Sequence, residues 1–332
     1  MSHGPARILD ALRRAGGGTC SGELLSSEYG VSRAQIWKHV EALRAKGYKI
    51  DGDPGGGYRL CEIPDRLYPE EIRAGLETRW LACDIRYFES VDSTNRVALE
   101  LARSGAAHGT TVVAEQQTAG RGRLGRAFFS PPGANLYTSI VLRPRIDTAA
   151  APSWILAAAI AVAEAIEQIL GESDCVEIKW PNDVLLGGLK ASGILMELGA
   201  EAARVEFLVL GIGVNLNVDR GDFPDEFRAR ATSLASYSGR RIDRLAFARE
   251  LYTDLEAIFD LCAERGFDGV RSRFEARFRM SGKPICVVEL DGSEWRATAL
   301  GIDDDGALRV RRDDGRLSRV IAGDVTLAKE SA

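Results

Sequence analysis

The stretch Gln117-Thr118-Ala119-Gly120-Arg121-Gly122-Arg123-Leu124-Gly125-Arg126 decides between two kinds of fold. Its residues 120–125 match GxGxxG, the glycine pattern of dinucleotide-binding folds, in which a helix begins at the glycines. Here Phe128-Phe129-Ser130-Pro131-Pro132-Gly133 follows. Proline removes a backbone donor and clashes with the preceding turn, so this segment cannot be the body of a helix. The sequence therefore excludes a dinucleotide-binding fold at this loop.

Residues 117–126, the arginine loop, have the composition of an anion-binding segment. The three glycines let backbone N–H groups approach an anion closely, and the three arginines add forked donors that suit carboxylate and phosphate groups. A mobile surface loop with solvated charges is the alternative. Leu124, Phe128 and Phe129 argue against it, because apolar side chains imply that the loop packs against the protein. We therefore predict that the loop binds a small carboxylic acid and the phosphates of a nucleotide.

Composition limits the class of protein. The chain has 332 residues, a hydrophobic content of 45% and a net charge of −5, which predicts two or three domains and excludes a generic nucleic-acid binder. The six cysteines include no CxxC pair and there are three histidines, so we expect neither a zinc site nor a disulfide framework. The longest apolar run, 154–163, is shorter than the roughly 20 residues that span a bilayer. We expect a cytoplasmic protein without a membrane segment.

Residues 1–63 have the pattern of a winged helix-turn-helix. Two short helices precede a third at about 32–46, in which Ile36, Val40 and Leu43 share one side. Ser32 is a favourable N-cap for this third helix. Two short strands around a glycine-rich tip at 51–57 then predict a β-hairpin, the wing of the motif.

This N-terminal domain is predicted to bind DNA. Residues 1–60 hold nine lysines and arginines against six acids, and this excess of positive charge favours an anionic partner. The third helix would enter the major groove, and Lys38 and the wing would meet phosphates. The predicted DNA contacts are Ser32, Arg33, Gln35 and Lys38. Docking of a protein is the alternative for such a module, and Trp37 could be a packing residue.

Two further domains are predicted, at 66–280 and 281–329, which gives an α+β chain. The first alternates strands with helices, among them long helices at about 153–170 and 244–265, and this pattern indicates a mixed sheet. The second has five short apolar runs separated by Asp-Gly and glycine turns. Strands so closely spaced predict a small β-barrel.

Three polar clusters in the middle domain are candidates for ligand binding. Ser93-Thr94-Asn95 stands before a helix, where Ser93 or Thr94 could also be a plain N-cap. Lys190 follows Lys179-Trp180-Pro181-Asn182-Asp183 and precedes the small pair Ser192-Gly193, although a strand lysine can also be an exposed edge charge. Gly211-Ile212-Gly213-Val214-Asn215 places glycines in a strand, which indicates the close approach of a ligand.

These motifs, in this order, are similar to those of biotin–protein ligases. With the N-terminal winged helix, the chain resembles the bifunctional form, the biotin operon repressor. The resemblance covers nearly the whole chain and rests most on the arginine loop and on residues 179–183. It implies a class II synthetase-like central domain and an SH3-like C-terminal barrel. It also implies that biotin, ATP and Mg²⁺ are bound.

The resemblance also implies a role for each motif. Biotin would contact Ser93, Thr94, Asn95, Gln117, Gly120, Arg121, Gly122, Arg123, Lys190 and Gly193. ATP would contact Arg121, Arg123, Arg126, Phe128, Lys179, Asn182, Lys190 and Asn215. The catalytic residues would be Lys190, Arg123 and Asp183, with Asp183 acting on Mg²⁺ or on the acceptor lysine. The family often has tryptophan at the position of Phe128; phenylalanine keeps the aromatic wall and lacks the indole N–H.

The implied reaction has two steps. The biotin carboxylate attacks the α-phosphorus of ATP and gives biotinyl-5′-AMP and pyrophosphate, while arginines, a lysine and Mg²⁺ stabilise the charge. A lysine of the biotin carboxyl carrier protein of acetyl-CoA carboxylase then attacks the anhydride. The repressor form would bind operator DNA of biotin synthesis genes as a homodimer when it carries the adenylate.

Three other interpretations stay open. A lipoate–protein ligase shares the middle fold. A ligand-sensing regulator could lack ligase activity. A ligase could also carry a winged helix that no longer represses, because a fold alone does not establish function.

Overall fold

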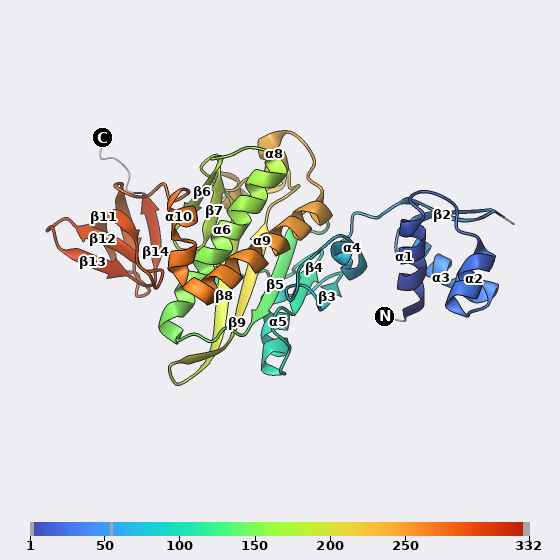
Figure 1. Cartoon of the computed structure of the whole chain (residues 1–332). Helices are drawn as coiled ribbons and strands as arrows, with labels where there is room; N and C mark the ends of the chain where they lie inside the picture. The colour runs from blue at the N-terminus through green and yellow to red at the C-terminus, as the bar shows by residue number, and fades with distance from the viewer. Residues whose placement is uncertain (1–2, 54–55, 328–332) are drawn as a thin grey trace. The chain divides into compact units, whose positions relative to one another are not determined.

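The structure is a computed structural model that describes residues 3–53 and 56–327 (Figure 1). The chain divides into two compact units between Arg66 and Leu67. The predicted limits of the second and third domains, 66–280 and 281–329, remain a prediction.

The first unit is a winged helix-turn-helix, as predicted. Its elements are α1 (His3–Arg14), α2 (Gly22–Tyr29), α3 (Arg33–Ala45) and the antiparallel pair β1 (Lys49–Asp53) and β2 (Gly57–Glu62). The side chain of Ser32 accepts a hydrogen bond from the backbone N–H of Gln35 at 3.2 Å and so caps α3. Ile36, Val40 and Leu43 are buried. The predicted tip of the wing includes residues 54–55, which lie outside the described residues.

The outer face of α3 carries the predicted DNA contacts. Ser32, Arg33 and Lys38 are exposed, and Gln35 is half-buried beside His39. Trp37 is 54% exposed, so it is not a core residue of this unit. The face that would meet a groove is therefore cationic with one large aromatic side chain.

The second unit is built on a mixed seven-stranded sheet in the order β3-β4-β5-β9-β8-β7-β6. Only β3 and β4 are parallel neighbours. The strands are β3 (Ile85–Phe88), β4 (Thr111–Ala114), β5 (Leu136–Leu142), β6 (Val176–Lys179), β7 (Asp183–Leu186), β8 (Leu189–Glu201) and β9 (Arg204–Val214). The main helices are α4 (Pro69–Arg73), α5 (Thr94–Arg103), α6 (Ala151–Leu170) and α9 (Arg244–Arg265).

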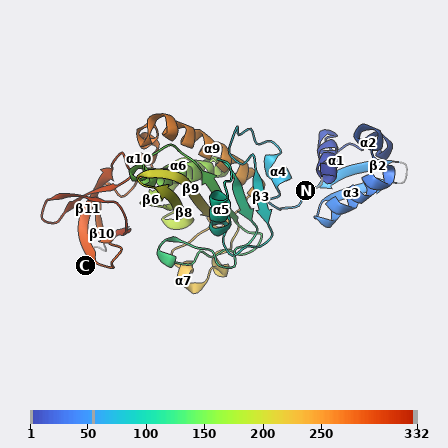
Figure 2. The ribbon, with the colours of Figure 1, turned by 90° about the horizontal axis from the view of Figure 1, so that it is seen from below.

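Helices cover both faces of this sheet (Figure 2). On one face, Val112, Val141 and Val209 pack against Ala98 and Ala102 of α5. On the other face, the neighbouring positions on the same strands pack in one core with α6 and α9. Successive residues of a strand point to opposite faces, which explains why these central strands are apolar throughout.

Helix α6 extends well beyond the apolar run at 154–163. The stretch Thr148–Leu170 is long and apolar enough, by length and composition, to cross a membrane, but 78% of its apolar window is buried inside the protein. Trp154 stacks on Phe259 of α9 with ring centroids 5.2 Å apart. The helix is thus placed as a core helix between the sheet and α9.

The C-terminal segment forms the five expected strands. They are β10 (Pro284–Val288), β11 (Glu294–Ile302), β12 (Leu308–Arg312), β13 (Leu317–Val320) and β14 (Asp324–Leu327), all antiparallel, in the order β13-β12-β11-β10-β14. Ile285, Val287 and Val325 share the large core with α6. The indole N–H of Trp180 donates to the carbonyl of Gly306 at 2.9 Å. The small sheet is therefore part of the second unit.

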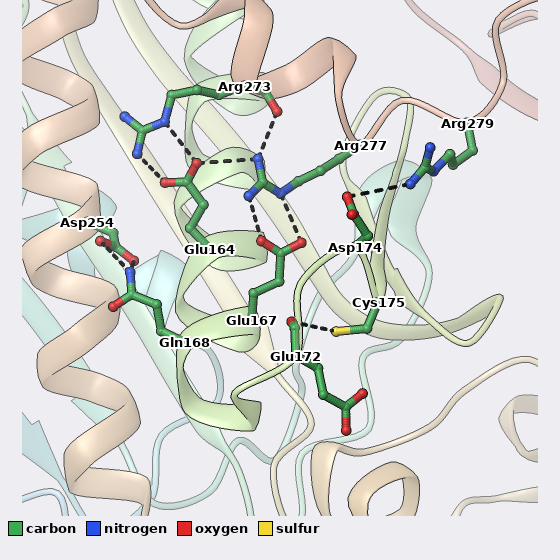
Figure 3. A network of polar contacts seen from close by, with 10 residues as sticks. All are labelled: Glu164, Glu167, Gln168, Glu172, Asp174, Cys175, Asp254, Arg273, Arg277 and Arg279. Atoms are coloured by element: carbon green, nitrogen blue, oxygen red, sulfur yellow. Dashed lines mark hydrogen bonds and ion pairs between the residues drawn. The ribbon is translucent and has the colours of Figure 1, made fainter.

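A network of ion pairs fastens the segment before this sheet to α6 (Figure 3). The Arg273 Nε donates to Glu164 Oε1 at 2.8 Å, and the Arg277 Nε donates to Glu167 Oε1 at 3.2 Å. Both glutamates are on α6, and Arg273 is on α10 (Arg271–Glu275). The backbone N–H of Ile178 in β6 donates to the carbonyl of Arg277 at 3.0 Å. These contacts limit movement of the small sheet against the seven-stranded sheet and α6.

Asp254 on α9 lies beside this network and gives a testable pH dependence. Burial, together with the carboxylates of Glu250 and Glu164, raises its pKa to about 7. The folded protein then holds this proton more tightly than the unfolded chain, so stability falls as pH rises from about 4 to about 7. We expect Asp254→Asn to raise the urea midpoint of unfolding at pH 8 and to change it little at pH 4.

Asp174→Asn is the matched control, because Asp174 is exposed and lies 3.8 Å from Arg279. It should leave the midpoint nearly unchanged at both pH values. An Asp254→Asn effect of equal size at pH 4 and pH 8 would contradict the proposed cause.

Candidate functional site

One cavity of about 740 Å³ brings together almost all the predicted site residues. It lies where the arginine loop, the middle strands and the C-terminal sheet meet. The predicted residues that line it are Ser93, Thr94, Asn95, Gln117, Arg121, Gly122, Arg123, Arg126, Phe128, Lys179, Asn182, Asp183, Lys190, Gly193 and Asn215. Gly120 is not among them. A Cβ on Gly120 would lie 2.6 Å from the backbone oxygen of Phe128, so the loop's own packing requires this glycine.

The arginine loop folds back on itself. The backbone N–H of Gly122 donates to Arg126 O at 2.7 Å, and that of Phe128 donates to Gly120 O at 2.9 Å. Leu124 and Gly125 make the turn with φ of 56° and 71°. Only a three-residue 3₁₀ turn, Arg123–Gly125, lies here, which agrees with the exclusion of a dinucleotide-binding fold. Leu124 is 55% exposed, so the expectation that it packs against the protein is wrong.

Phe128 occupies a hollow made by two glycines. Gly193 of β8 and Gly213 of β9 are register partners. A Cβ would lie 2.5 Å from the Phe128 ring at Gly213 and 3.5 Å from it at Gly193. At Gly211 a Cβ would lie 1.9 Å from Asn95 Oδ1. Gly211 and Gly213 of β9 were expected to admit a ligand. They instead make room for the side chains of Asn95 and Phe128. These two side chains line the cavity.

A cluster of polar side chains around Thr94, Asn95 and Gln117, the polar floor, lines part of the cavity. The backbone N–H and the Oγ1 of Thr94 donate to Gln117 Oε1 at 2.9 and 3.1 Å. Ser139 Oγ lies 2.7 Å from Asn95 Oδ1 and 2.8 Å from Thr94 Oγ1. Ser93 occupies the N-cap position of α5 but makes no side-chain cap hydrogen bond. The plain N-cap alternative therefore has no support, and these side chains are fixed by one another.

Lys190 and Asp183 form an ion pair inside the cavity. Their Nζ and Oδ1 atoms are 2.5 Å apart, and the side chains are 35% and 20% exposed. Lys190 is thus not a simple edge charge. Asn182 Nδ2 donates to Ile194 O at 2.8 Å, which ties the segment after the cis Trp180-Pro181 bond to β8. Asp183 and Lys190 would have to separate for either one to contact a ligand fully.

Asn215 is a buried residue of the cavity lining. Its Nδ2 donates to Thr232 O at 3.1 Å, and its Oδ1 accepts from Asn135 Nδ2 at 3.4 Å. The side chain therefore holds the neighbouring segment in place, and its predicted contact with adenine remains a prediction.

Arg123 joins three parts of the chain. Its Nη1 lies 3.4 Å from Asn182 Oδ1 and 3.5 Å from Asp324 Oδ1, and its Nη2 donates to Gly323 O at 3.0 Å. Burial lowers the pKa of the Arg123 guanidinium from its ordinary value, and the carboxylates of Asp324 and Asp183 oppose that shift. Arg126 also pairs with Asp324. The C-terminal sheet thus reaches into the cavity.

Several lining residues were not predicted. They are Phe223, Phe227, Arg230, Val288, Asp324, Val325 and Thr326, to which Ser139 is added beneath the floor. The Thr138-Ser139 pair inside an apolar strand was a usable signal for Ser139. The others lie far from the motifs along the chain, and no local pattern marks them.

The lining of the cavity carries an excess of positive charge. Six lysine and arginine side chains and three aspartate and glutamate side chains line it, and this excess of positive charge favours a polyanionic ligand. The polar floor, by contrast, offers neutral donors and acceptors. This combination suits a ligand that has both a neutral polar part and a strongly anionic part.

Family models match three successive parts of the chain. Residues 6–59 match an HTH domain, residues 87–215 match the biotin/lipoate A/B protein ligase family, and residues 280–327 match the biotin protein ligase C-terminal domain. The order agrees with the winged helix, the central sheet and the small C-terminal sheet.

Comparisons with full-length relatives and with solved structures agree with these family matches. The bifunctional ligase/repressor BirA of Bacillus subtilis is 37% identical over 96% of this chain and 97% of its own. BirA of Escherichia coli is 33% identical over 97% of each chain. A biotin protein ligase from Aquifex aeolicus, solved with biotin and ATP, superposes with a TM-score of 0.64 at 26% identity, over 75% of this chain and all of that one. The chain therefore belongs to the biotin–protein ligase family, in its bifunctional ligase/repressor form with an N-terminal helix-turn-helix.

Proposed function

We propose that this chain makes biotinyl-5′-AMP from biotin and ATP and transfers biotin to a lysine of the biotin carboxyl carrier protein of acetyl-CoA carboxylase. Its helix-turn-helix makes it also a biotin-responsive repressor of biotin synthesis genes in the cytoplasm. The observation that carries the ligase proposal is that one cavity is lined both by the neutral Thr94–Gln117 floor and by an excess of cationic side chains.

In the first step, the residues of the cavity would orient two anions and stabilise their charge. The floor would hold the uncharged ring of biotin through Thr94, Asn95 and Gln117. Lys190 would leave Asp183 and bind the carboxylate and the α-phosphate, while Arg121 and Arg126 would bind phosphate oxygens. The attacking carboxylate is already ionised, so no general base is needed, and fixed cations lower the barrier by stabilising the transition state.

Asp183 fits a role beside Mg²⁺. Magnesium is commonly held by one or two carboxylates together with substrate phosphates and water. Among the described residues no group of three or more His, Cys, Asp or Glu side chains is arranged to hold a metal. Asp183 is the carboxylate of the cavity that would help to hold a Mg²⁺ ion once Lys190 has moved to the substrate. Mg²⁺ would neutralise part of the phosphate charge.

In the second step, the acceptor lysine attacks the mixed anhydride. The amine must lose a proton, and Asp183, freed from Lys190, is the carboxylate in the cavity that we propose accepts it or orients the amine. Phe128 and the arginine loop would cover the adenylate and exclude water, which protects the anhydride from hydrolysis.

The direct test is incubation of the chain with biotin, MgATP and a biotin carboxyl carrier domain, followed by mass measurement of the acceptor. We expect the mass to rise by one biotinyl group. Lipoate in place of biotin should give no product, and lipoylation without biotinylation would favour the lipoate ligase alternative. No labelling at all, in a chain that still binds biotin, would favour a regulator without ligase activity.

Lys190→Ala should lose most adenylate formation, because it removes the cation that we place between carboxylate and α-phosphate. We expect biotin-dependent exchange of pyrophosphate into ATP to fall by about 10²–10³-fold, the cost of removing one transition-state donor. Lys283→Ala, at an exposed residue outside the cavity, is the control. Near-normal exchange in Lys190→Ala would refute the role of Lys190.

The outer face of α3 is proposed to bind operator DNA. Replacing Arg33 and Lys38 together by alanine should abolish retention of a duplex that carries the promoter of biotin synthesis genes. It should also leave acceptor biotinylation unchanged, because both residues lie in the first unit. At salt concentrations low enough for residual binding, loss of the predicted Lys38 phosphate contact should lower the salt dependence of binding by about one counterion. Undiminished retention would contradict this surface, and a wild type that never binds the duplex would indicate a ligase without repression.

A homodimer of the adenylate-bound form is also proposed, and β8 offers an edge for it. Strand β7 pairs with residues 189–193 of β8, and Ile194 still bonds Asn182. Residues 195–201 of β8 pair with β9 on one side. On their other side, no strand in the described part of the chain pairs with them. Leu198 in this stretch is 43% exposed. An unpaired edge can join a second copy across a two-fold axis, and sedimentation with and without biotin and MgATP tests this.

A further inference from the structure

A carboxylate of the C-terminal sheet holds the arginine loop. Asp324 is the first residue of β14, and its two oxygens contact different arginines: Oδ1 lies 3.5 Å from Arg123 Nη1, and Oδ2 pairs with Arg126 Nη2. The Asp324 side chain is 20% exposed. The next residue back, Gly323, accepts a further hydrogen bond from Arg123 Nη2 at 3.0 Å. Two residues of one turn thus bind two residues of the loop, about 200 positions away.

We propose that Asp324 is a positioning residue, which holds the arginine loop in its binding conformation before ATP arrives. It would do so through Arg123 and Arg126. The inference rests on the proposed function, because it assumes that the loop binds the phosphates of ATP.

Asp324 is itself held in place. Its backbone is paired with Val288 of β10. Gly323 has φ of 116°, and a Cβ there would lie 2.5 Å from Val288 O, so only glycine allows this tight turn into β14. The small sheet is fixed to the ligase core by the Trp180–Gly306 hydrogen bond and by the ion pairs of Figure 3. The carboxylate is therefore a fixed point against which the loop can be ordered.

The loop needs such a fixed point. Arg121, Arg123 and Arg126 lie within six residues, and their like charges repel one another in an empty cavity. Leu124 at the turn is exposed and adds little packing. A long arginine side chain also loses conformational entropy when it is fixed. A loop that is ordered beforehand removes this ordering cost from the binding of ATP.

Of the two arginines that Asp324 contacts, one keeps donors that can bind phosphate. Arg123 is 19% exposed, and both of its Nη atoms are used by Asn182, Gly323 and Asp324. Arg126 is 62% exposed and contacts Asp324 through Nη2. Its Nε and Nη1 remain for oxygen atoms of a ligand. The two arginines therefore have different tasks: Arg123 anchors the loop, and Arg126 presents donors to the phosphates.

A competing role for Asp324 would change the affinity for ATP in the opposite direction. If Asp324 acted as a competitor that occupies the arginines until ATP displaces it, its removal would tighten the binding of ATP. Positioning predicts weaker binding of ATP and a looser loop in the empty protein. The two roles can thus be separated by one variant.

The test uses Asp324→Asn in the full chain, with trypsin as a probe of the loop. Trypsin cleaves after arginine, so cleavage after residues 121, 123 or 126 reports how often the loop opens. In the absence of ligands we expect cleavage about five- to tenfold faster than in wild type, the size of one charge-assisted contact. Saturating biotin and MgATP should restore protection. In pyrophosphate exchange, KM for ATP should rise by a similar factor while kcat changes by less than about twofold.

Two further variants complete the test. Asp305→Asn is the matched control, since Asp305 pairs with Arg319 in the same sheet and does not line the cavity; it should match wild type in cleavage and KM. Asp324→Glu keeps the carboxylate and should recover most of the protection.

Equal urea midpoints of unfolding for the variants would exclude general unfolding as the cause. If Asp324→Asn unfolds, a comparison of Asp324→Glu with Asp324→Ser tests the same contact.

Three results would overturn the proposal: cleavage of Asp324→Asn at the wild-type rate, a lowered KM for ATP, or a fall in kcat with KM unchanged. Failure of the proposed function is distinguishable from these results. In that case wild type would form no adenylate and gain no protection from biotin and MgATP. The cleavage of the empty variant would still report whether Asp324 holds the loop.

Discussion

The accumulation of positive charge around one cavity is the constraint on which the site depends. Six cationic side chains must be held together while no ligand is bound, and three carboxylates are present to balance them. Each of the two closest pairings uses a carboxylate from a different segment: Asp183 with Lys190, and Asp324 with Arg123 and Arg126. Unbalanced charges in a partly buried site would be costly, so the empty site keeps Lys190, Arg123 and Arg126 paired with carboxylates.

Glycines decide how closely the walls of this site approach. Gly193 and Gly213 stand opposite each other on β8 and β9, and the absence of two side chains leaves room for the Phe128 ring. Gly211 does the same for Asn95. A side chain at Gly213 would displace the aromatic wall, one at Gly211 would displace Asn95 of the polar floor, and one at Gly193 would crowd the end of Lys190. The strand register and the loop therefore specify the shape of the cavity together.

The sequence predicted the regular elements well and the long-range contacts poorly. The helix at 244–265 was located at its observed limits, and five strands were found where five short apolar runs had been predicted to form them, because periodicity and flanking turns are local signals. The four motifs that line the cavity were also found. Asp324 and Arg230 were not, since each reaches the site through tertiary contact alone. The prediction that Leu124 packs against the protein was wrong for the same reason, because an apolar side chain in a loop does not reveal whether another residue packs on it.

Strand β8 connects the proposed biotin site with the edge proposed to form the dimer. Its first residues include Lys190 and Gly193 in the cavity, and its later residues, 195–201, form the free edge. Asn95 of the polar floor donates to Leu195 O at 3.3 Å and to Glu197 Oε2 at 3.0 Å, so a group predicted to contact biotin also bonds the edge strand. Ligand binding can bias the edge only if it favours one arrangement of this strand. A ligand that reorders the Asn95 contacts would meet that condition within the second unit, without any contact to the helix-turn-helix.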